Sequence, residues 1–367
     1  MSLKVSCSSF LKVHDMCVKR GGHPVIDIPS LSVEEHEVLT LIGPNGSGKS
    51  TLMLTLASLL KPYQGSLVFK GSAVDSASAR ATYRKNLAMV FQEPLLFDTT
   101  VFENVAAGLK IRGKNRQEIN SIVKKNLEQF GISHLARRSA RKLSGGEAQR
   151  TSLARAFAIE PEIIFLDEPF ASLDPPTRET LVDDLHAILR QTKTTAVIAT
   201  HDRLEALRLS DNMAVIFQGR ISQIGSPEEV MNRPVDDRVA LFVGTETILT
   251  GTVTKIHDGT FVLTVAGMEL EAVGPVSLGE QVVCCIRPEQ VTISTNTPSI
   301  HTSARNTFNG TIVKIVPMGL FYKVQLDCGF PLVSYVTTQS VENLELQIGK
   351  TVAATFKATS IHIINNN

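Results

Sequence analysis

The sequence has few of the features that mark secreted, membrane-spanning or nucleic-acid-binding proteins. Its 367 residues include five cysteines, an odd number without a Cys-x-x-Cys pair, which is typical of a reducing cytoplasm. No apolar run approaches the roughly 20 residues of a membrane-spanning helix, and the N-terminus has no apolar stretch of the signal-peptide kind. The 37 basic residues are balanced by 36 acidic ones, which argues against a general electrostatic hold on nucleic acid. We therefore expect a cytoplasmic protein that associates with a membrane only through a partner.

Length and patterning predict two domains of different fold class. Hydrophobic residues make up 43% and charged residues 20% of the chain, which is ordinary for a globular protein. The chain is longer than a single hydrophobic core usually supports. Strand-like and helix-like segments alternate over residues 1–240, which predicts an α/β domain with a helical subdomain at about 93–150. Short alternating strands and glycine turns over residues 241–367 predict an all-β barrel domain.

A glycine-rich loop between a strand-like run and a helix-like run carries the strongest chemical signal. The glycines permit a backbone path in which successive N–H groups face a phosphate chain, and the N-terminus of the following helix adds a positive dipole end. Lys49 is then expected to reach the β- and γ-phosphates of a nucleotide, and the Ser50 hydroxyl to bind Mg²⁺. A plain glycine turn before a helix is the alternative, and the flanking strand and helix disfavour it. The expected ATP-binding residues are Gly43, Pro44, Asn45, Gly46, Ser47, Gly48, Lys49, Ser50 and Thr51.

Further polar residues follow predicted strands, where ligands of parallel sheets usually bind. Asp167 and Glu168 end a buried apolar run, and alone such an acid would only end a strand. Together with the glycine loop, Asp167 is the expected Mg²⁺ partner of Ser50, and Glu168 can orient or deprotonate a water aimed at the γ-phosphate. Gln92 ends another strand and is a candidate for both the magnesium site and catalysis. His201 follows a later strand and is a candidate γ-phosphate contact.

The order of these motifs resembles that in the ATP-binding subunit of an ABC transporter, over roughly residues 10–235. The segment 143–150, LSGGEAQR in one-letter code, is similar to the family's signature and precedes a predicted helix from Thr151 to Ala158. The resemblance implies binding and hydrolysis of ATP with Mg²⁺. It also implies that the segment after Gln92, including the apolar residues 95–97, contacts a membrane permease, and that an external binding protein delivers the cargo.

ATP sites in this family are shared between two copies of the ATPase. The chain has one glycine loop and one signature, so the resemblance implies a head-to-tail homodimer. The residues that would contact the γ-phosphate held by the other copy, or form the neighbouring loop, are Ser144, Gly145, Gly146 and Asp174. Family members usually stack an aromatic residue on adenine, but residues 19–23 contain none. Arg20 and His23 remain open as stacking residues.

The all-β tail contains an internal repeat. The segment 251–256 recurs as the segment 310–315, and the ends of the two halves share the spacing of their apolar residues. We therefore expect a duplicated OB-like fold with halves at about 246–295 and 302–365.

Part of the second half resembles the molybdate-binding (Mop) version of the transporter-associated OB domain, called TOBE. The stretches concerned are residues 302–306 and 357–360, and hydroxyls, N–H groups and two cations suit a desolvated tetrahedral dianion. The first half has Glu246 at the position of Arg305, and an acid there would repel an oxyanion. Either only the second half binds the oxyanion, or the sites form between the halves or between chains. A predicted turn at residues 337–340 could add a hydroxyl. The expected oxyanion ligands are Ser303, Ala304, Arg305 and Lys357, unless the two cations are ordinary surface groups.

Together these features predict an ATPase at the cytoplasmic face of the membrane that powers import of molybdate or tungstate through a separate permease, with a tail that senses the oxyanion. Sulfate, ferric iron, polyamines and sugars are alternative cargoes, although a polyamine or sugar sensor would have no use for the basic Ser-Ala-Arg-Asn element. A soluble ABC ATPase that acts on ribosomes or DNA is the alternative from another class. Such proteins usually pair two ATPase halves or carry long coiled-coil insertions, and the sequence has neither. The sequence does not separate molybdate from tungstate, because the two ions have nearly the same size and charge.

Overall fold

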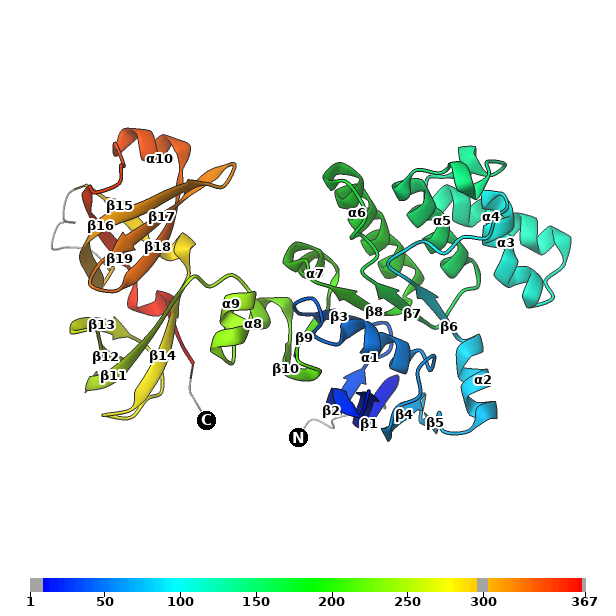
Figure 1. The fold of residues 1–367 in the computed structure, drawn as a ribbon, viewed down its shortest axis with the longest axis horizontal. Coiled ribbons are helices and arrows are strands. Elements are labelled where there is room, and N and C mark those ends of the chain that lie inside the picture. Colours follow the sequence, from blue (N-terminus) through cyan, green and yellow to red (C-terminus); the bar gives the residue numbers. More distant parts are fainter. Residues whose placement is uncertain (1–8, 296–302, 365–367) are drawn as a thin grey trace, which may run out of the picture. The chain divides into compact units, whose positions relative to one another are not determined.

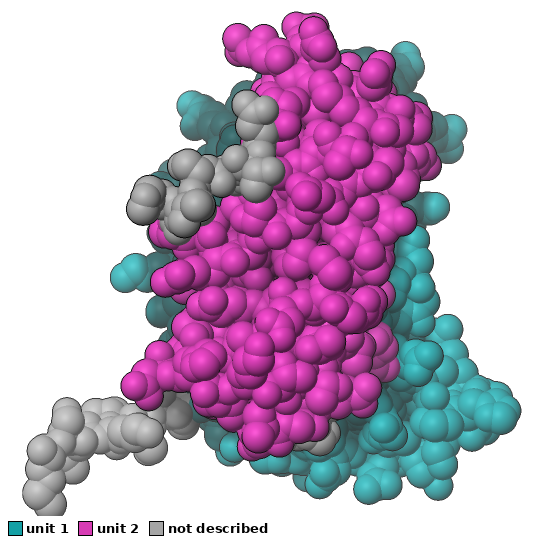
Figure 2. Space-filling model, turned by 90° about the vertical axis from the view of Figure 1, so that its left-hand side faces the viewer, with its two compact units in different colours: residues 1–227 teal, residues 228–367 magenta. Residues whose placement is uncertain are grey.

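A computed structural model describes residues 9–295 and 303–364 of the chain, which form two compact units, residues 1–227 and 228–367 (Figure 1 and Figure 2). The first unit is an α/β structure, and the second is built mainly of strands. Both predicted fold classes are therefore confirmed. No helix in the described ranges is both long and apolar enough to cross a membrane.

A six-stranded sheet organises the first unit. In spatial order its strands are β10 (Arg220–Gly225), β9 (Asn212–Phe217), β3 (Val38–Ile42), β8 (Thr195–Thr200), β7 (Ile163–Asp167) and β6 (Leu87–Val90). The neighbours β3, β8 and β7 are parallel and buried along their length, because both faces of the sheet are covered. Ile163 and Phe165 face one hydrophobic core, and Ile164 and Leu166 face the other.

An antiparallel sheet and α1 (Lys49–Leu56) share the first of these cores. The strands of this sheet, in spatial order, are β2 (His23–Val33), β1 (Leu11–Arg20), β4 (Gln64–Phe69) and β5 (Ser72–Ala73). β1 and β2 form an antiparallel hairpin around Gly21 and Gly22. The short helix α2 (Ala77–Lys85) adds Tyr83 to the same core.

Helices supply the second core, which lies on the opposite face of the six-stranded sheet (Figure 1). They are α3 (Val101–Ile111), α4 (Arg116–Gln129), α5 (Gly145–Ala158), α6 (Pro175–Thr192) and α7 (Arg203–Leu209), with 3₁₀ turns η1 (Ser133–Leu135) and η2 (Ala140–Lys142). The predicted start of α5 at Thr151 is wrong, because the helix already begins at Gly145. Ser144 and Glu147 form a capping box there: Glu147 N donates to Ser144 Oγ at 3.3 Å, and Ser144 N donates to Glu147 Oε2 at 2.8 Å.

The second unit contains two five-stranded antiparallel sheets, preceded by α8 (Pro227–Asn232) and α9 (Asp237–Phe242). One sheet has the order β13 (Met268–Ala272), β12 (Thr260–Val265), β11 (Thr247–His257), β14 (Gln281–Ile286) and β20 (Ile361–Ile364). The other has the order β15 (Thr292–Ser294), β19 (Thr351–Phe356), β16 (Asn306–Pro317), β17 (Phe321–Asp327) and β18 (Pro331–Thr337). The halves of the repeat exchange their last strands, since β20 pairs with β14 and β15 pairs with β19. Both sheets enclose one hydrophobic core.

Close packing of strands explains why the two halves of the repeat share a glycine at the same position. A Cβ on Gly251 of β11 would lie 2.7 Å from Val265 Cγ2, and a Cβ on Gly310 of β16 would lie 2.5 Å from Cys328 Sγ. Each long strand also shifts register against its neighbour shortly after its glycine. In each half of the repeat, the glycine at the same position therefore allows its long strand to pack closely against the neighbouring strand.

The tail is not purely strand, which corrects one expectation. The predicted turn at residues 337–340 is the start of a short helix, α10 (Thr338–Asn343). Thr337 caps this helix, because Ser340 N donates to Thr337 Oγ1 at 3.2 Å. The hydroxyl of Thr337 is thus already engaged in local structure.

Candidate functional site

The glycine loop connects β3 to α1 and brings the backbone very close to its neighbours. A Cβ on Gly43 would lie 2.2 Å from Ile216 O of β9, so no larger residue fits without a backbone shift. Gly48 caps α1 with a φ of 107°, in the left-handed region that favours glycine. The loop therefore presents its backbone N–H groups at the N-terminus of α1, an arrangement suited to an anion.

Lys49 is the first residue of α1, and its side chain folds back over the loop. Its ammonium donates to Gly43 O at 2.8 Å and to Pro44 O at 3.2 Å, and lies 3.7 Å from Glu168 Oε1. Burial lowers the pKa of Lys49, and the charges of Glu168 and Asp167 oppose that effect. The ammonium is thus kept beside two carboxylates and directly above the anion-binding loop.

Ser50 and Asp167 meet across the site from α1 and the end of β7. Ser50 Oγ donates to Asp167 Oδ1 at 3.0 Å. Burial raises the pKa of Asp167, and the hydrogen bond from Ser50 opposes that rise. Hydroxyl and carboxylate oxygens are ligands that Mg²⁺ accepts. The described residues contain no cluster of three His, Cys, Asp or Glu side chains that could hold a metal alone, so a cation here would need ligands from phosphate or water.

Glu168 lies next to Asp167 and is held by β8 and the segment that follows it. Its Oε2 lies 2.8 Å from His201 Nδ1, which follows β8, and its backbone N donates to Ala199 O at 2.9 Å. Glu168 also has a φ of 47°, a left-handed conformation that is uncommon for a side chain of its size. Such backbone strain is concentrated at functional sites, where the surrounding structure enforces it.

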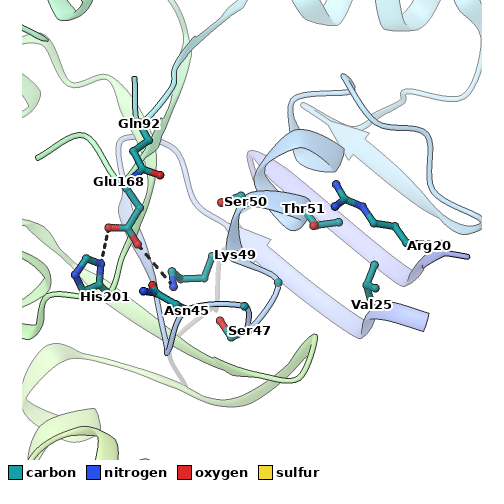
Figure 3. A pocket seen from close by; sticks show the side chains of 12 residues that line it. Arg20, Val25, Asn45, Ser47, Lys49, Ser50, Thr51, Gln92, Glu168 and His201 are labelled. Atoms are coloured by element: carbon teal, nitrogen blue, oxygen red, sulfur yellow. Dashed lines mark hydrogen bonds and ion pairs between the residues drawn. The ribbon is translucent and has the colours of Figure 1, made fainter. Parts of the chain in front are cut away.

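Apart from Asp167, which reaches the site only through its hydrogen bond with Ser50, these side chains line a cavity of about 430 Å³ (Figure 3). Ser47 Oγ is buried at its wall without a hydrogen-bond partner among the described residues, and a phosphate oxygen would supply one. Arg20 and Val25 lie at the other end of the site from Glu168 (Figure 3). The remaining lining residues are Asn45, Gly46, Gly48, Lys49, Ser50, Thr51, Gln92 and His201.

Most of the predicted nucleotide residues thus come together in one place. Gly43 and Pro44 do not line the cavity but support Lys49 through their carbonyl oxygens. Of the two candidates for stacking on adenine, Arg20 lines the cavity and His23 does not. Val25 was not predicted, because nothing in the local sequence of β2 shows which of its residues faces the loop.

The signature residues form a separate group and do not line this cavity. A Cβ on Gly146 would lie 2.7 Å from Thr177 Cγ2, which places the start of α5 against the start of α6. Asp174 caps α6, since Thr177 N donates to Asp174 Oδ2 at 3.3 Å. Hydrogen bonds from the side chain and then the backbone of Thr177 lower the pKa of Asp174. These contacts bring together the residues that are expected to meet the nucleotide held by a second copy, namely Ser144, Gly145, Gly146 and Asp174.

The predicted oxyanion ligands all lie in the second unit. Asn306 pairs with Phe356, so the preceding Arg305 and the following Lys357 lie at adjacent strand ends, and both side chains are exposed. Ser303 is exposed and Ala304 is half-buried. In the first half, the corresponding Glu246 forms an ion pair with Lys323 and accepts a hydrogen bond from Tyr335 Oη at 2.6 Å.

A glycine loop before a helix, beside a carboxylate at the end of a parallel strand, is the arrangement that P-loop ATPases use to hold nucleotide phosphates. The family profile "ABC transporter" matches residues 26–171, and the profile "TOBE domain" matches residues 302–363. The first half of the tail lies outside the second match.

Comparison with known proteins extends the similarity from these two matched segments to most of the chain. The molybdate/tungstate import ATP-binding protein WtpC of Pyrococcus abyssi is 35% identical, over 91% of this chain and 94% of that protein. The Fe(3+) ions import ATP-binding protein FbpC of Streptomyces avermitilis is 38% identical, over 81% of this chain and 84% of that protein. The structure of cbiO1 from Clostridium perfringens, described as part of an ABC transporter complex, has a TM-score of 0.57 and 31% identity, over 60% of this chain and 90% of that one. The chain therefore belongs to the ATP-binding proteins of ABC transporters and is an ATPase with a TOBE tail.

Proposed function

We propose that this ATPase powers import of molybdate or tungstate through separate permease subunits. The observation that carries the proposal is the similarity to the molybdate/tungstate import protein, which extends over both units and 91% of the chain. The ferric-iron import protein has a slightly higher identity, 38% against 35%, but over a smaller share of the chain, so ferric iron is the second candidate cargo. Uptake of molybdate, tungstate and ferric iron by cells that lack and then regain this chain tests the choice. Restoration of ferric-iron uptake alone would refute the proposal.

The cavity residues fit a magnesium nucleotide. Ser47 Oγ lacks a partner among the described residues, and Ser50 already holds Asp167 Oδ1 at 3.0 Å, so hydroxyl and carboxylate oxygens converge beside the loop. In our proposal Ser50, Asp167 and Gln92 hold Mg²⁺, directly or through water, and Lys49 binds the β- and γ-phosphates. The bound ion would neutralise charge on the phosphate oxygens. Thr51 and the loop glycines add backbone and hydroxyl donors.

Glu168 is the proposed base and His201 its partner. The bond between Oε2 and His201 Nδ1, at 2.8 Å, leaves the other oxygen of Glu168 facing Lys49 at 3.7 Å. A nucleotide that takes over the Lys49 ammonium would free this oxygen to orient a water and accept its proton. His201 would keep the carboxylate in place and contact the γ-phosphate.

Two copies of the chain would complete two ATP sites. The signature residues do not line the cavity of their own chain, and α5 begins with the N–H groups of Gly145 and Gly146 behind the capping residue Ser144. We propose that these groups, with Asp174, face the γ-phosphate held by the partner copy in a head-to-tail homodimer. ATP-dependent dimerisation of Glu168→Gln, measured by light scattering, tests this. A monomer at saturating ATP would refute it.

The permease would dock beside Gln92. Leu95 and Phe97 follow this residue and each is 58% exposed, and Arg155 Nη1 donates to Leu95 O at 2.7 Å, which links the patch to α5. Exposed apolar side chains beside a nucleotide site suit a protein partner. We propose a peripheral location at the cytoplasmic face of the membrane, with the cargo delivered by an external binding protein, and no nucleic-acid partner. An ATPase rate that is insensitive to permease would instead favour a soluble ABC ATPase.

The tail is the proposed oxyanion sensor. Arg305 and Lys357 lie at adjacent strand ends, and Ser303 and Ala304 add donors close by. Binding of molybdate or tungstate there would shift the dimer toward a state that cannot hydrolyse ATP. Titration of the full chain with molybdate, tungstate and sulfate, alongside Arg305→Ala and Lys357→Ala, tests the site. An ATPase rate of the assembled transporter unchanged by saturating molybdate would refute the regulation.

A further inference from the structure

A small cavity of about 160 Å³ lies between α6 and α7 in the first unit, apart from the nucleotide site (Figure 1). Arg178 of α6 lines it from one side, and Asp202 and Glu205 line it from the other. Arg178 Nε is buried and has no hydrogen-bond partner among the described residues. A buried donor without a partner costs free energy, so the contact between the two helices is incomplete.

The acids that face Arg178 lie just beyond hydrogen-bonding distance. Nε is 3.9 Å from Glu205 Oε1, and Nη1 is 3.7 Å from Asp202 Oδ2. A charge-assisted bond between such groups is about 2.7–2.9 Å long. A movement of about 1 Å at the start of α7 would therefore give Nε its missing partner, and the cavity provides the space for this movement.

The same acids hold the residues on both sides of His201. Glu205 Oε2 accepts a hydrogen bond from Thr200 Oγ1 at 2.6 Å, and this hydroxyl oxygen accepts one from Asp202 N at 3.0 Å. His201 lies between Thr200 and Asp202, and its Nδ1 is 2.8 Å from Glu168 Oε2. A shift of Glu205 into the cavity would therefore move the segment that carries His201.

The loop that precedes α6 is held by the other side of the Arg178 guanidinium. Nη2 donates to Leu173 O at 3.3 Å, and the next residue, Asp174, caps the helix. Prolines at the first two positions of α6 stiffen this turn, because their φ angles are restricted. A Cβ on Gly146 would lie 3.9 Å from Leu173 Cδ2, so the loop also supports the start of α5. One guanidinium thus joins this loop to the segment around His201.

We propose that Arg178 is a positioning residue for ATP hydrolysis. Closing of its Nε onto Glu205 Oε1 sets His201 in the position that keeps Glu168 aimed at water. Its bond to the loop before α6 connects this closing to the group that would meet the nucleotide of the partner copy. The proposal rests on the roles proposed above for Glu168 and His201. It goes beyond them because Arg178 is not among the residues that line the nucleotide cavity and acts only through other residues.

The competing explanation is that Arg178 only fastens α6 to α7, with a water molecule between Nε and Glu205. A second arginine separates the two explanations. Arg208 lines the same cavity and pairs with Asp183 across the same two helices. In the described part of the chain its guanidinium has no ion pair or hydrogen bond with the loop before α6 or with residues 200–205. Arg208→Gln is therefore the matched control for a loss of charge and packing.

The test is steady-state ATP hydrolysis by the full chain at pH 8, above the pKa of about 7 to which burial raises Glu205. We expect Arg178→Gln and Glu205→Gln each to lower kcat about tenfold, the effect of one charge-assisted hydrogen bond, with KM for ATP changed less than about twofold. Glutamine at position 205 still accepts the bond from Thr200, so this variant keeps its fold while its amide faces Nε of Arg178 without a charge. Arg208→Gln should leave kcat and KM unchanged.

A second comparison shows whether Arg178 acts through His201. Added to His201→Ala, Arg178→Gln should lower kcat by less than about a further twofold, because the residue that it positions is then absent. Release of radiolabelled phosphate detects the slow turnover expected of these variants.

Three results would overturn the proposal and leave the proposed role of His201 intact. They are an unchanged kcat in Arg178→Gln, an equal loss in Arg208→Gln, and a full tenfold loss when Arg178→Gln is added to His201→Ala. A His201→Ala variant with unchanged kcat would overturn both this proposal and the proposed role of His201.

Discussion

Replacing Glu205 by glutamine should remove a pH dependence from the stability of the ATPase unit. Glu205 is 6% exposed on α7, and its Oε2 accepts a hydrogen bond from Thr200 Oγ1 at 2.6 Å. Burial raises the pKa of Glu205 to about 7 from an ordinary 4.5. Asp202 and Glu168 raise it as well, while Thr200 and Arg178, whose Nε lies 3.9 Å from Oε1, lower it.

The sign of the effect follows from proton linkage. Between pH 4.5 and about 7 the folded state holds a proton on Glu205 that the unfolded state has lost, so folding stability falls as pH rises through this window. At about 1.4 kcal/mol per pH unit the loss reaches about 3 kcal/mol. Glutamine keeps the shape and the hydrogen bond without the charge. The two proteins should therefore be about equally stable near pH 4.5, and Glu205→Gln should be more stable at pH 8.

Scanning calorimetry of both proteins from pH 5 to pH 8 measures this. For a unit of this size about 3 kcal/mol corresponds to a gap of roughly 6–12 °C in melting temperature at the alkaline end. Glu179→Gln, an exposed carboxyl on α6, is the matched control and should leave the pH profile unchanged. Parallel profiles of the unaltered chain and Glu205→Gln would refute the reasoning, because they would mean that Glu205 is charged in the folded state throughout.

Other substitutions probe the site and the tail. Glu168→Gln should abolish ATP hydrolysis, because an amide cannot accept a proton, while nucleotide binding followed by fluorescence persists; continued phosphate release would contradict the proposed base. Ser50→Ala removes the donor to Asp167 at 3.0 Å and should weaken magnesium-dependent nucleotide affinity about tenfold, measured with and without Mg²⁺; equal loss in both conditions would argue against a magnesium ligand. Gly310→Ala places a Cβ 2.5 Å from a cysteine sulfur and should cost about 1–3 kcal/mol in chemical denaturation; an unchanged midpoint would show that the strands can separate freely.

Local motifs made much of the ATPase site predictable. The loop from Gly43 to Thr51 is contiguous, and its conformation depends on glycines that the sequence shows directly. Glu168 and His201 are far apart in sequence, yet each follows a parallel strand, and such strand ends meet at one edge of a sheet. The start of α5 was predictable too, because Ser144 and Glu147 have the spacing of a capping box, and it was missed.

Contacts that depend on the whole fold were not predictable. Val25 lines the nucleotide cavity because β2 packs beside the loop, where Val25 O would lie 3.2 Å from a Cβ on Gly48. Glu205 and Arg178 are brought together by two helices whose separate sequences contain no sign of the pairing. The burial that raises the pKa of Glu205 exists only once those helices have packed.

The strand exchange in the tail could not be predicted from the sequence either, and it has a physical consequence. Repetition in sequence identifies two similar halves, but each half is equally compatible with closing on its own last strand or on that of its neighbour. The structure adopts the second solution, in which β20 covers the edge of β14 and β15 covers the edge of β19. Each sheet then depends on residues from the other half, and one hydrophobic core serves both. A ligand at the end of either half would therefore act on the tail as a single body, as the proposed sensor role requires.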